Sequence, residues 1–242
     1  MPTNRAVRLY VTPTEFDLPM LLLEGERARR VLSVLRLPVG APLRVFDGDG
    51  RERHATLEAA TRTLATLRLG APLAPLPEPR LRLTLCCAFP RGARGDWLVE
   101  KATELGVAAF APLEADRAVM HAGDGRLDRW RRIAIEAAEQ CGRATVPAFL
   151  DTPPLDALAL VADLDVTRTP SEALAAASVA STVEALALYV GPEGGWSDDE
   201  RAAHAAAGHV FVTLGPRTLR VETAAVALLT LSLAALEVRR SA

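Results

Sequence analysis

The sequence Gly191-Pro192-Glu193-Gly194-Gly195 directly follows Ala185–Val190, a short and wholly apolar run. Such a run is typical of a parallel strand that is buried on both faces. The glycines after it leave backbone N–H and C=O groups uncovered and tolerate a positive φ, so the backbone can approach a flat polar ligand closely. Ser197 then has the position of a helix N-cap, with Glu200 at the spacing of a capping box. This part of the chain predicts a buried strand, a ligand-binding loop and a helix.

A second glycine loop follows the next apolar run, His209–Thr213. The loop reads Leu214-Gly215-Pro216-Arg217-Thr218-Leu219-Arg220-Val221-Glu222-Thr223 and leads into the apolar stretch Ala224–Leu236. In open α/β sheets, ligands bind beyond the carboxyl ends of the strands. Either loop alone reads as an ordinary glycine turn. The two together, with two arginines and a carboxylate in the second, predict one pocket.

Composition and charge limit the possible classes of protein. The chain has 242 residues, 50% of them hydrophobic, which is enough for a sizeable core in one large domain or two small ones. The net charge of −2 does not indicate a nucleic-acid binder as a whole. Residues 1–72, however, carry 11 arginines against 8 acidic residues, which is +3 and leaves −5 for the remainder. Any RNA-binding surface is therefore local, and the first segment is the candidate.

The three cysteines, Cys86, Cys87 and Cys141, have neither the spacing of metal ligands nor an even number for disulfides. We expect reduced core residues and no metal site. We expect no cleavable signal sequence, because Arg5 and Arg8 lie among short mixed residues and no long apolar stretch follows them. The longest apolar stretch, Ala224–Leu236, is too short to cross a membrane. These features favour a cytoplasmic enzyme or RNA-binding protein.

The segment 1–72 predicts a small β-barrel domain. One helix, Gly25–Leu35, and a tight hairpin turn, Asp47-Gly48-Asp49-Gly50, accompany its strands. The predicted strands are Val7–Val11, Leu43–Phe46, Ala55–Ala59 and Leu64–Leu69. Closely spaced prolines follow, at Pro72, Pro75, Pro77 and Pro79, and exclude both helix and central strand. Residues 73–79 are therefore predicted to be a stiff linker.

Residues 80–242 predict a second domain of the α/β class, because strands and helices alternate along it. Such alternation is typical of a mostly parallel sheet that is covered on both faces. The predicted strands before the two loops are Leu81–Ala88, Val107–Ala111, Pro147–Leu150, Leu155–Leu160 and Ala162–Val166, and the predicted helices are Asp96–Leu105, Leu127–Gly142 and Ser171–Ala177.

The chain resembles the RsmE family of ribosomal RNA methyltransferases, which belongs to the SPOUT class. The resemblance rests on GPEGG at Gly191–Gly195, LGPRTLRVETA at Leu214–Ala224 and KATELGV at Lys101–Val107. It also rests on Glu139-Gln140-Cys141-Gly142-Arg143 and on Val34-Leu35-Arg36-Leu37 with Gly40. The family implies an N-terminal PUA-like barrel and a C-terminal SPOUT domain with a trefoil knot. It also implies S-adenosylmethionine as cofactor and a homodimer that builds each active site from two chains.

The activity implied by the resemblance is methylation of N3 of a uridine in 16S (small-subunit) ribosomal RNA, within the small ribosomal subunit. Uracil N3 must lose its proton before it attacks a methyl group. Loss of the proton leaves a negative charge that spreads to the two carbonyl oxygens. Arg143 and Arg220 suit the stabilisation of that charge. Glu193 or Glu222 could orient an arginine or accept the proton, and the sequence does not choose between them.

The remaining predictions concern binding. Cofactor contacts are expected from Gly191, Pro192, Glu193, Gly194, Gly195, Leu214, Gly215, Leu219 and Arg220, and RNA contacts from Arg5, Arg8, Arg29, Arg30 and Arg36. A solvated helix face would also explain the last three arginines. The loop Gly191–Gly195 has the spacing of neither a dinucleotide-binding nor a Walker motif. Two alternatives stay open: a SPOUT enzyme that modifies transfer RNA or a ribose hydroxyl, and a non-catalytic RNA-binding protein of the same fold.

Overall fold

The structure is a computed structural model that describes residues 7–113, 125–180 and 183–238. The chain divides into two compact units. Unit 1 comprises Met1–Glu78 and Ala138–Val146, and unit 2 comprises Pro79–Ala137 and Pro147–Ala242. The short segment Ala138–Val146 thus groups with the N-terminal unit, although the sequence places it inside the C-terminal segment. Each unit is described below by itself.

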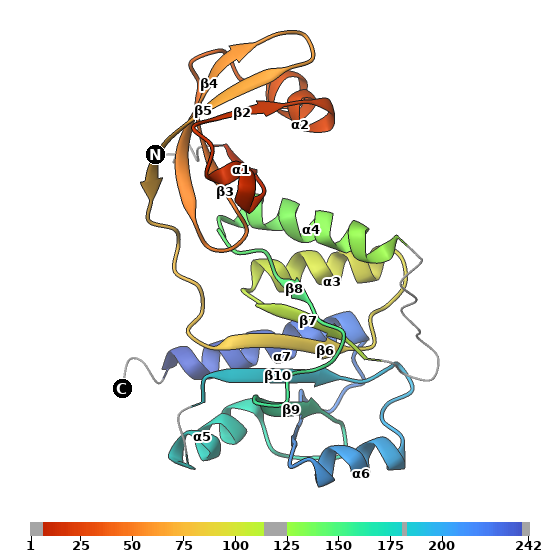
Figure 1. Ribbon diagram of the computed structural model, residues 1–242. Coiled ribbons are helices and arrows are strands. Elements are labelled where there is room, and N and C mark those ends of the chain that lie inside the picture. Colours follow the sequence, from red (N-terminus) through yellow and green to blue (C-terminus); the bar gives the residue numbers. More distant parts are fainter. Residues whose placement is uncertain (1–6, 114–124, 181–182, 239–242) are drawn as a thin grey trace. The chain divides into compact units, whose positions relative to one another are not determined.

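Unit 1 is built on a five-stranded mixed sheet with the order β1-β3-β4-β5-β2 (Figure 1). Its strands are β1 (Arg8–Tyr10), β2 (Met20–Leu23), β3 (Pro42–Phe46), β4 (Glu52–Ala60) and β5 (Ala65–Leu73). Strands β1 and β3 are parallel, and the other neighbours are antiparallel. The short strands β1 and β2 form the two edges, with no ladder between them among the described residues. The predicted barrel is therefore a curled, open half-barrel.

The helical part of unit 1 differs from the prediction in detail. The expected helix Gly25–Leu35 consists of α2 (Gly25–Arg29) and a π-helical turn, η1 (Arg30–Val34). Helix α1 (Pro13–Phe16) was not predicted; Thr12 and Glu15 form a capping box at its start. Strand β2 was also missed, since four residues are too few to establish a period.

The expected hairpin turn lies between β3 and β4, where one carboxylate organises it. Asp47 accepts hydrogen bonds from the backbone N–H groups of Asp49 and Arg51, at 2.9 and 3.0 Å. Strand β5 continues through Pro72, which the prediction had placed outside any strand. Beyond Leu69 the strand pairs only with β4, so its other edge is unpaired. Proline has no backbone N–H to donate, and an unpaired edge does not require one.

Unit 2 contains a six-stranded sheet in which every recorded pair is parallel, as predicted. Its order is β11-β9-β10-β6-β7-β8. The strands are β6 (Arg82–Cys87), β7 (Ala109–Pro112), β8 (Ala148–Phe149), β9 (Leu158–Ala162), β10 (Ala185–Val190) and β11 (Val210–Val212). The central strand β10 is buried along its whole length, as a strand covered on both faces must be.

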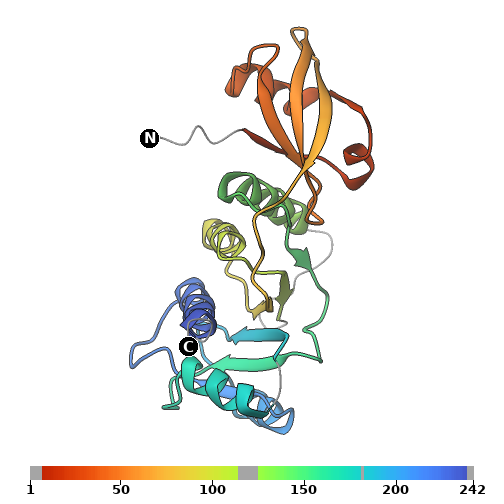
Figure 2. The same ribbon diagram turned by 90° about the vertical axis from the view of Figure 1, so that its left-hand side faces the viewer.

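The helices of unit 2 are α3 (Ala93–Glu104), α4 (Arg126–Cys141), α5 (Pro170–Ala180), α6 (Asp198–Ala206) and α7 (Val221–Val238). Helix α4 starts in unit 2 and ends in unit 1. Helices α3 and α7 pack against each other, and Figure 2 shows them side by side. Among the described helices, none combines the length and the apolar character needed to cross a membrane.

One prediction for unit 2 was wrong. The expected strands Leu155–Leu160 and Ala162–Val166 are a single strand, β9. The strand ends because Asp163 accepts a hydrogen bond from the N–H of Asp165 and turns the chain. Cys86 and Cys87 are free and buried, as expected, and burial raises the pKa of the Cys86 thiol to about 12.

Candidate cofactor pocket and active site

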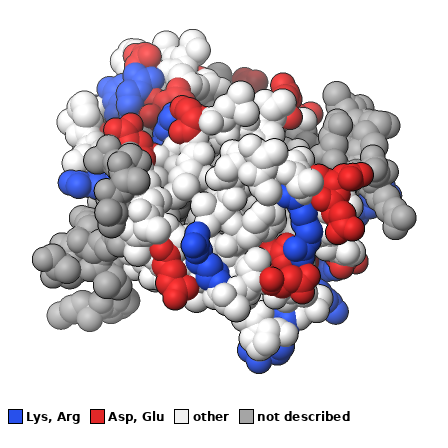
Figure 3. All heavy atoms as spheres, turned by 90° about the horizontal axis from the view of Figure 1, so that it is seen from below, with Lys and Arg blue, Asp and Glu red and all other residues white. Residues whose placement is uncertain are grey.

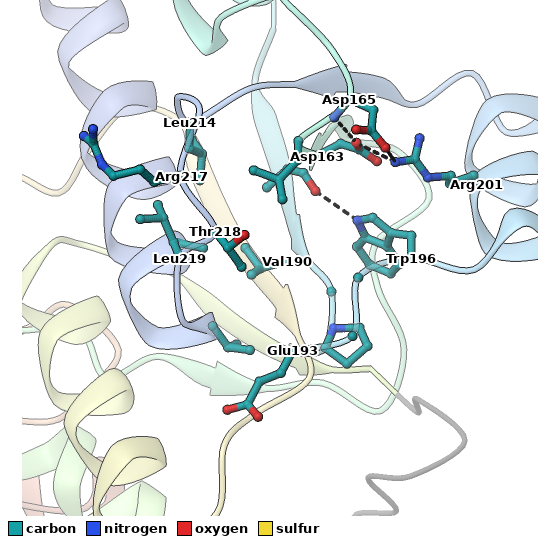
Figure 4. Close-up of a pocket in the computed structure, with 18 residues that line it drawn as sticks. Asp163, Asp165, Val190, Glu193, Trp196, Arg201, Leu214, Arg217, Thr218 and Leu219 are labelled. Carbon is teal, nitrogen blue, oxygen red and sulfur yellow. Dashed lines mark hydrogen bonds and ion pairs between the residues drawn. The ribbon is translucent and has the colours of Figure 1, made fainter.

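A cavity of about 420 Å³ lies beyond the carboxyl ends of β9, β10 and β11, which are neighbours in the sheet. The chain leaves each of these strands through a loop, and the three loops and the start of α7 form the walls (Figure 4). The lining residues are Ala162, Asp163, Leu164, Asp165, Val190, Gly191, Pro192, Glu193, Gly194, Gly195, Trp196, Arg201, Leu214, Arg217, Thr218, Leu219, Val221 and Ala224. The two glycine loops therefore meet at one pocket, as the sequence predicts.

The loop after β10, Gly191–Trp196, is held in place by Trp196. The indole N–H of Trp196 donates a hydrogen bond of 2.9 Å to the carbonyl of Ala162 at the end of β9 (Figure 4). A Cβ on Gly191 would come within 2.9 Å of the Trp196 ring, so only glycine allows this packing. Gly195 has φ +75°, and the space where its Cβ would lie is open. A side chain at Gly195 would therefore be strained.

Helix α6 begins directly after this loop, with the predicted capping box. Ser197 accepts a hydrogen bond from the N–H of Glu200, and the Glu200 side chain accepts one from the N–H of Ser197. The cap fixes where the loop ends.

A charged network on the third loop was missed by the sequence reasoning. Arg201 of α6 binds the carboxylates of Asp163 and Asp165, at 2.7 and 2.8 Å (Figure 4). The Asp163 side chain is 1% exposed, and its Oδ2 has no hydrogen-bond partner in the described part of the chain. The local signal was an acidic pair directly after the apolar strand β9, but its arginine partner lies 36 to 38 residues away.

The second glycine loop contributes Leu214, Arg217, Thr218 and Leu219 to the pocket. Gly215 has φ +105° and donates its N–H to Thr213 Oγ1 at 3.1 Å. Of the predicted cofactor residues, Gly215 and Arg220 do not line the pocket. The side chain of Arg220 is exposed, one residue before α7.

The two candidate carboxylates lie in different environments. Glu193 is 65% exposed, whereas the side chain of Glu222 is 11% exposed and its Oε2 has no hydrogen-bond partner among the described residues. Arg94, a residue that the sequence reasoning did not select, lies 2.8 Å from Glu193 Oε1 and 4.0 Å from Glu222 Oε1. Figure 4 shows Glu193 on the side of the pocket opposite to Arg201.

Arg143 and Arg220 belong to different units. Arg143 is buried in unit 1, where its Nε and Nη2 contact Glu78 Oε2 at 3.0 and 2.7 Å. Neither arginine lines the pocket, but Arg220 lies between two residues that do, Leu219 and Val221.

The arginines proposed for RNA binding also differ from one another. Arg8 is buried and donates hydrogen bonds of 2.8 and 2.9 Å to the carbonyls of Ala138 and Arg143. Its Nε binds Glu52 at 3.0 Å, so we correct the prediction and assign Arg8 to packing. Its positive charge lies at the C-terminal end of α4, where it is favourable.

The arginines near η1 are more accessible. Arg29 and Arg36 are exposed, and Arg30 forms an ion pair with Glu139. Arg5 lies outside the described residues.

On the face shown in Figure 3, acidic and basic side chains lie beside one another around a broad uncharged area. That face lacks the single sign of charge that a phosphate-binding surface needs.

Comparisons with known proteins show the family to which the chain is similar. Residues 77–233 match the family described as RNA methyltransferase domain, and residues 23–70 match the RNA methyltransferase PUA domain. A protein of Synechocystis named ribosomal RNA small subunit methyltransferase E is 35% identical, over 90% of this chain and 74% of that protein. The protein of the same name from Mycobacterium tuberculosis is 32% identical, over 91% of this chain and 88% of its own length.

A solved structure extends the likeness to three dimensions. The protein of that name from Neisseria gonorrhoeae, bound to S-adenosyl methionine, has 30% identity and a TM-score of 0.81. The match covers 97% of this chain and 98% of that one. The chain therefore belongs to the RNA methyltransferase family whose members carry the name ribosomal RNA small subunit methyltransferase E.

Proposed function

We propose that the protein methylates N3 of a uridine in small-subunit ribosomal RNA and uses S-adenosylmethionine as the methyl donor. The observation that carries the proposal is the pocket built from three loops at adjacent strand ends, in a chain whose relative with 30% identity holds this cofactor. The residues fit such a ligand: backbone at Gly194 and Gly195 is open to it, and Val190, Leu214 and Leu219 give an apolar wall.

The cofactor, when bound, supplies an electrophilic methyl group on a positively charged sulfur. The protein must then remove the N3 proton of uracil and hold the ring in line with that methyl group. Glu222 is the better candidate for proton acceptor, because it is buried and one carboxylate oxygen has no hydrogen-bond partner among the described residues. Glu193 is exposed and already bound by Arg94.

Charge on the uracil carbonyl oxygens requires a cation in the transition state. Arg220 has the exposure and the position next to the pocket for this role. Arg143 would take the role only after it leaves Glu78, and it would then act on the pocket of a second chain. Both arginines remain part of the proposal.

RNA is proposed to bind unit 1 through Arg29, Arg30 and Arg36, within the small ribosomal subunit. Each phosphate contact adds about one unit to the dependence of affinity on salt. The double variant Arg29→Ala/Arg36→Ala should therefore bind RNA more weakly, with a smaller slope in a salt titration. An unchanged slope would assign these side chains to a solvated helix face.

We further propose a cytoplasmic homodimer whose C-terminal chain forms the trefoil knot of the SPOUT class. Trp97 of α3 and Leu231 of α7 are 42% and 45% exposed on helices that pack together, which suits an apolar interface. An obligate interface buries about 2,000 Å² or more. Light scattering should give twice the mass of one chain, and a mass near 25.8 kDa would contradict the dimer.

The main experiment identifies the product. The protein is incubated with labelled S-adenosylmethionine and unmodified small subunits, and the RNA is digested to nucleosides. Label in N3-methyluridine is expected. Label in a ribose, or in transfer RNA when that is offered, would support another SPOUT activity. No label, with the cofactor bound, would indicate a non-catalytic RNA-binding protein.

A further inference from the structure

Arg94 connects three segments of the site. It lies in the first turn of α3, and its Nη1 donates a hydrogen bond of 2.8 Å to Glu193 Oε1 on the loop after β10. The same nitrogen is 4.0 Å from Oε1 of Glu222, in the first turn of α7. One guanidinium therefore joins a helix, the cofactor loop and the helix that follows the second loop.

The backbone at Arg94 is fixed independently of these contacts. The N–H groups of Gly95 and Asp96 donate to the carbonyl of Gly92, at 3.0 and 3.2 Å. A Cβ on Gly95 would come within 2.2 Å of the carbonyl oxygen of Pro90, so the start of α3 packs against the loop after β6 as closely as glycine permits. Asp96 in the same turn also binds Arg129 of α4. The start of α3 is thus a rigid base for the arginine.

The three side chains Arg94, Glu193 and Glu222 carry one positive and two negative charges. Two carboxylates share one guanidinium, and Glu222, the buried one, needs a cation more than Glu193 does. The hydrogen bond to Glu193, and then the charges of Glu193 and Glu222, raise the pKa of Arg94. Arg94 and Glu193 are 45% and 65% exposed, so their ion pair adds little to stability. Its effect should appear in the site and not in the folding of the unit.

We propose that Arg94 is a positioning residue for methyl transfer, which holds Glu193 of the cofactor loop and Glu222 of α7 in their working places. The inference rests on the proposed function. Arg94 acts through the two carboxylates and is not assigned a contact with the substrate. Without it, Glu193 and Glu222 lose their shared cation, and the loop Gly191–Trp196 loses its link to α3.

The test uses Arg94→Ala, Arg94→Lys and a matched control, Arg91→Ala. Arg91 is an exposed arginine of the same segment and forms no recorded ion pair with a described residue. Because small displacements of reacting groups are costly, Arg94→Ala should lower kcat by roughly a hundredfold. Its KM for RNA should not change. Arg94→Lys should recover part of the loss, and Arg91→Ala should behave as the parent.

Rescue separates positioning from a general structural defect. Millimolar guanidinium ion should restore part of the activity of Arg94→Ala and should leave Arg91→Ala unchanged. Calorimetry should also show weaker S-adenosylmethionine binding in Arg94→Ala, a readout that does not depend on turnover. Thermal unfolding of the variants should match that of the parent.

Several outcomes would overturn the proposal. They are a kcat of Arg94→Ala close to that of the parent, an equal loss in Arg91→Ala, or a loss that neither lysine nor guanidinium repairs. If Arg94→Ala does not fold, Arg94→Lys decides by the same measurements. A parent protein that makes no methylated nucleoside would instead contradict the proposed function, so the two failures are distinguishable.

Discussion

The two glycine loops of the pocket differ in how they are held. The loop Gly191–Trp196 is fixed by the Trp196 hydrogen bond to Ala162, by the ion pair of Glu193 with Arg94 and by the cap at Ser197. The loop from Leu214 to Arg220 has one recorded side-chain hydrogen bond among the described residues, from Gly215 to Thr213. Both follow parallel strands, so topology alone does not explain the difference.

The contrast suggests a division of work. A loop that is fixed before the ligand arrives loses little conformational entropy on binding and defines the shape of the site. A loop with few contacts of its own can adjust around the substrate or a second chain. We therefore expect substitutions in the first loop to change cofactor affinity and substitutions in the second to change turnover.

The largest effect is expected from Gly195→Val. Gly195 has φ +75°, where a β-branched residue is strained by about 1–3 kcal/mol, and the new side chain would point into open space beside the pocket. Calorimetry should show no measurable S-adenosylmethionine binding. Gly208→Val is the matched control, since Gly208 has φ +74°, open space and no place in the pocket. Equal affinity in the two variants would show that the first loop is only a turn.

The second prediction concerns the other loop. Arg220→Ala removes a donor aimed at charge that develops during transfer, so turnover should fall by roughly a hundredfold while RNA affinity stays nearly the same. Single-turnover rates and a filter-binding titration measure the two quantities separately. A loss of RNA binding in proportion to activity would make Arg220 a phosphate clamp and would pass the catalytic role to Arg143 or to backbone donors of the first loop.

A smaller effect is expected from Trp196→Phe. Phenylalanine keeps an aromatic ring edge-on to His204, whose ring centre is 4.7 Å away, but loses the hydrogen bond to Ala162. One such bond contributes about 1 kcal/mol, which corresponds to roughly a fivefold loss of cofactor affinity. An affinity equal to that of the parent would mean that the cap and Arg94 hold the first loop without it.

The smallest effect concerns pH. His204 and His209 share a contact of 2.7 Å between their Nδ1 atoms. Burial lowers the pKa of His204, as does the charge of His209, and burial lowers the pKa of His209. Both values are lower in the folded chain than the ordinary 6.5, so the unfolded chain binds more protons below that pH. The free energy of unfolding should therefore decrease as the pH falls from 6.5 through the folded pKa values.

Thermal unfolding between about pH 5 and 8 measures this dependence. His209→Gln should reduce this dependence, because it removes one histidine of the pair. A curve equal to that of the parent would show that His204 and His209 do not cause the dependence.

Local pattern explains which features the sequence predicts. Strand β10 has the predicted bounds, and the cap at Ser197 is present, because both are encoded within a few neighbouring residues. Helix α1 and strand β2 are four residues each, which is too short for a period. The prediction added a second strand because Leu164 and Val166 alternate with Asp163 and Asp165, a strand-like pattern that continues past the turn at Asp163.

Long-range charge pairing explains most of what the sequence does not predict at the site. Arg94 binds a carboxylate 99 residues away, and Arg201 binds two that lie 36 and 38 residues away. No spacing rule covers such partners. Long-range contacts also explain Arg8. Its position in a basic segment suggested RNA contact, but it is buried by contacts to residues 130 and 135 positions later in the sequence.

The return of Ala138–Val146 to unit 1 has a consequence for any attempt to divide the gene. Residues of unit 2 lie on both sides of this segment in the sequence. Even so, Ala138 and Ala144 are buried in a cluster with Phe46, and Glu139 accepts a hydrogen bond from the N–H of Tyr10. A fragment that starts at residue 79 would carry this segment with its apolar side chains uncovered, and it would lack the N–H of Tyr10 that binds Glu139. No single cut in the polypeptide therefore yields two intact halves, and a methyltransferase half expressed alone should aggregate unless the residues of this return are also replaced.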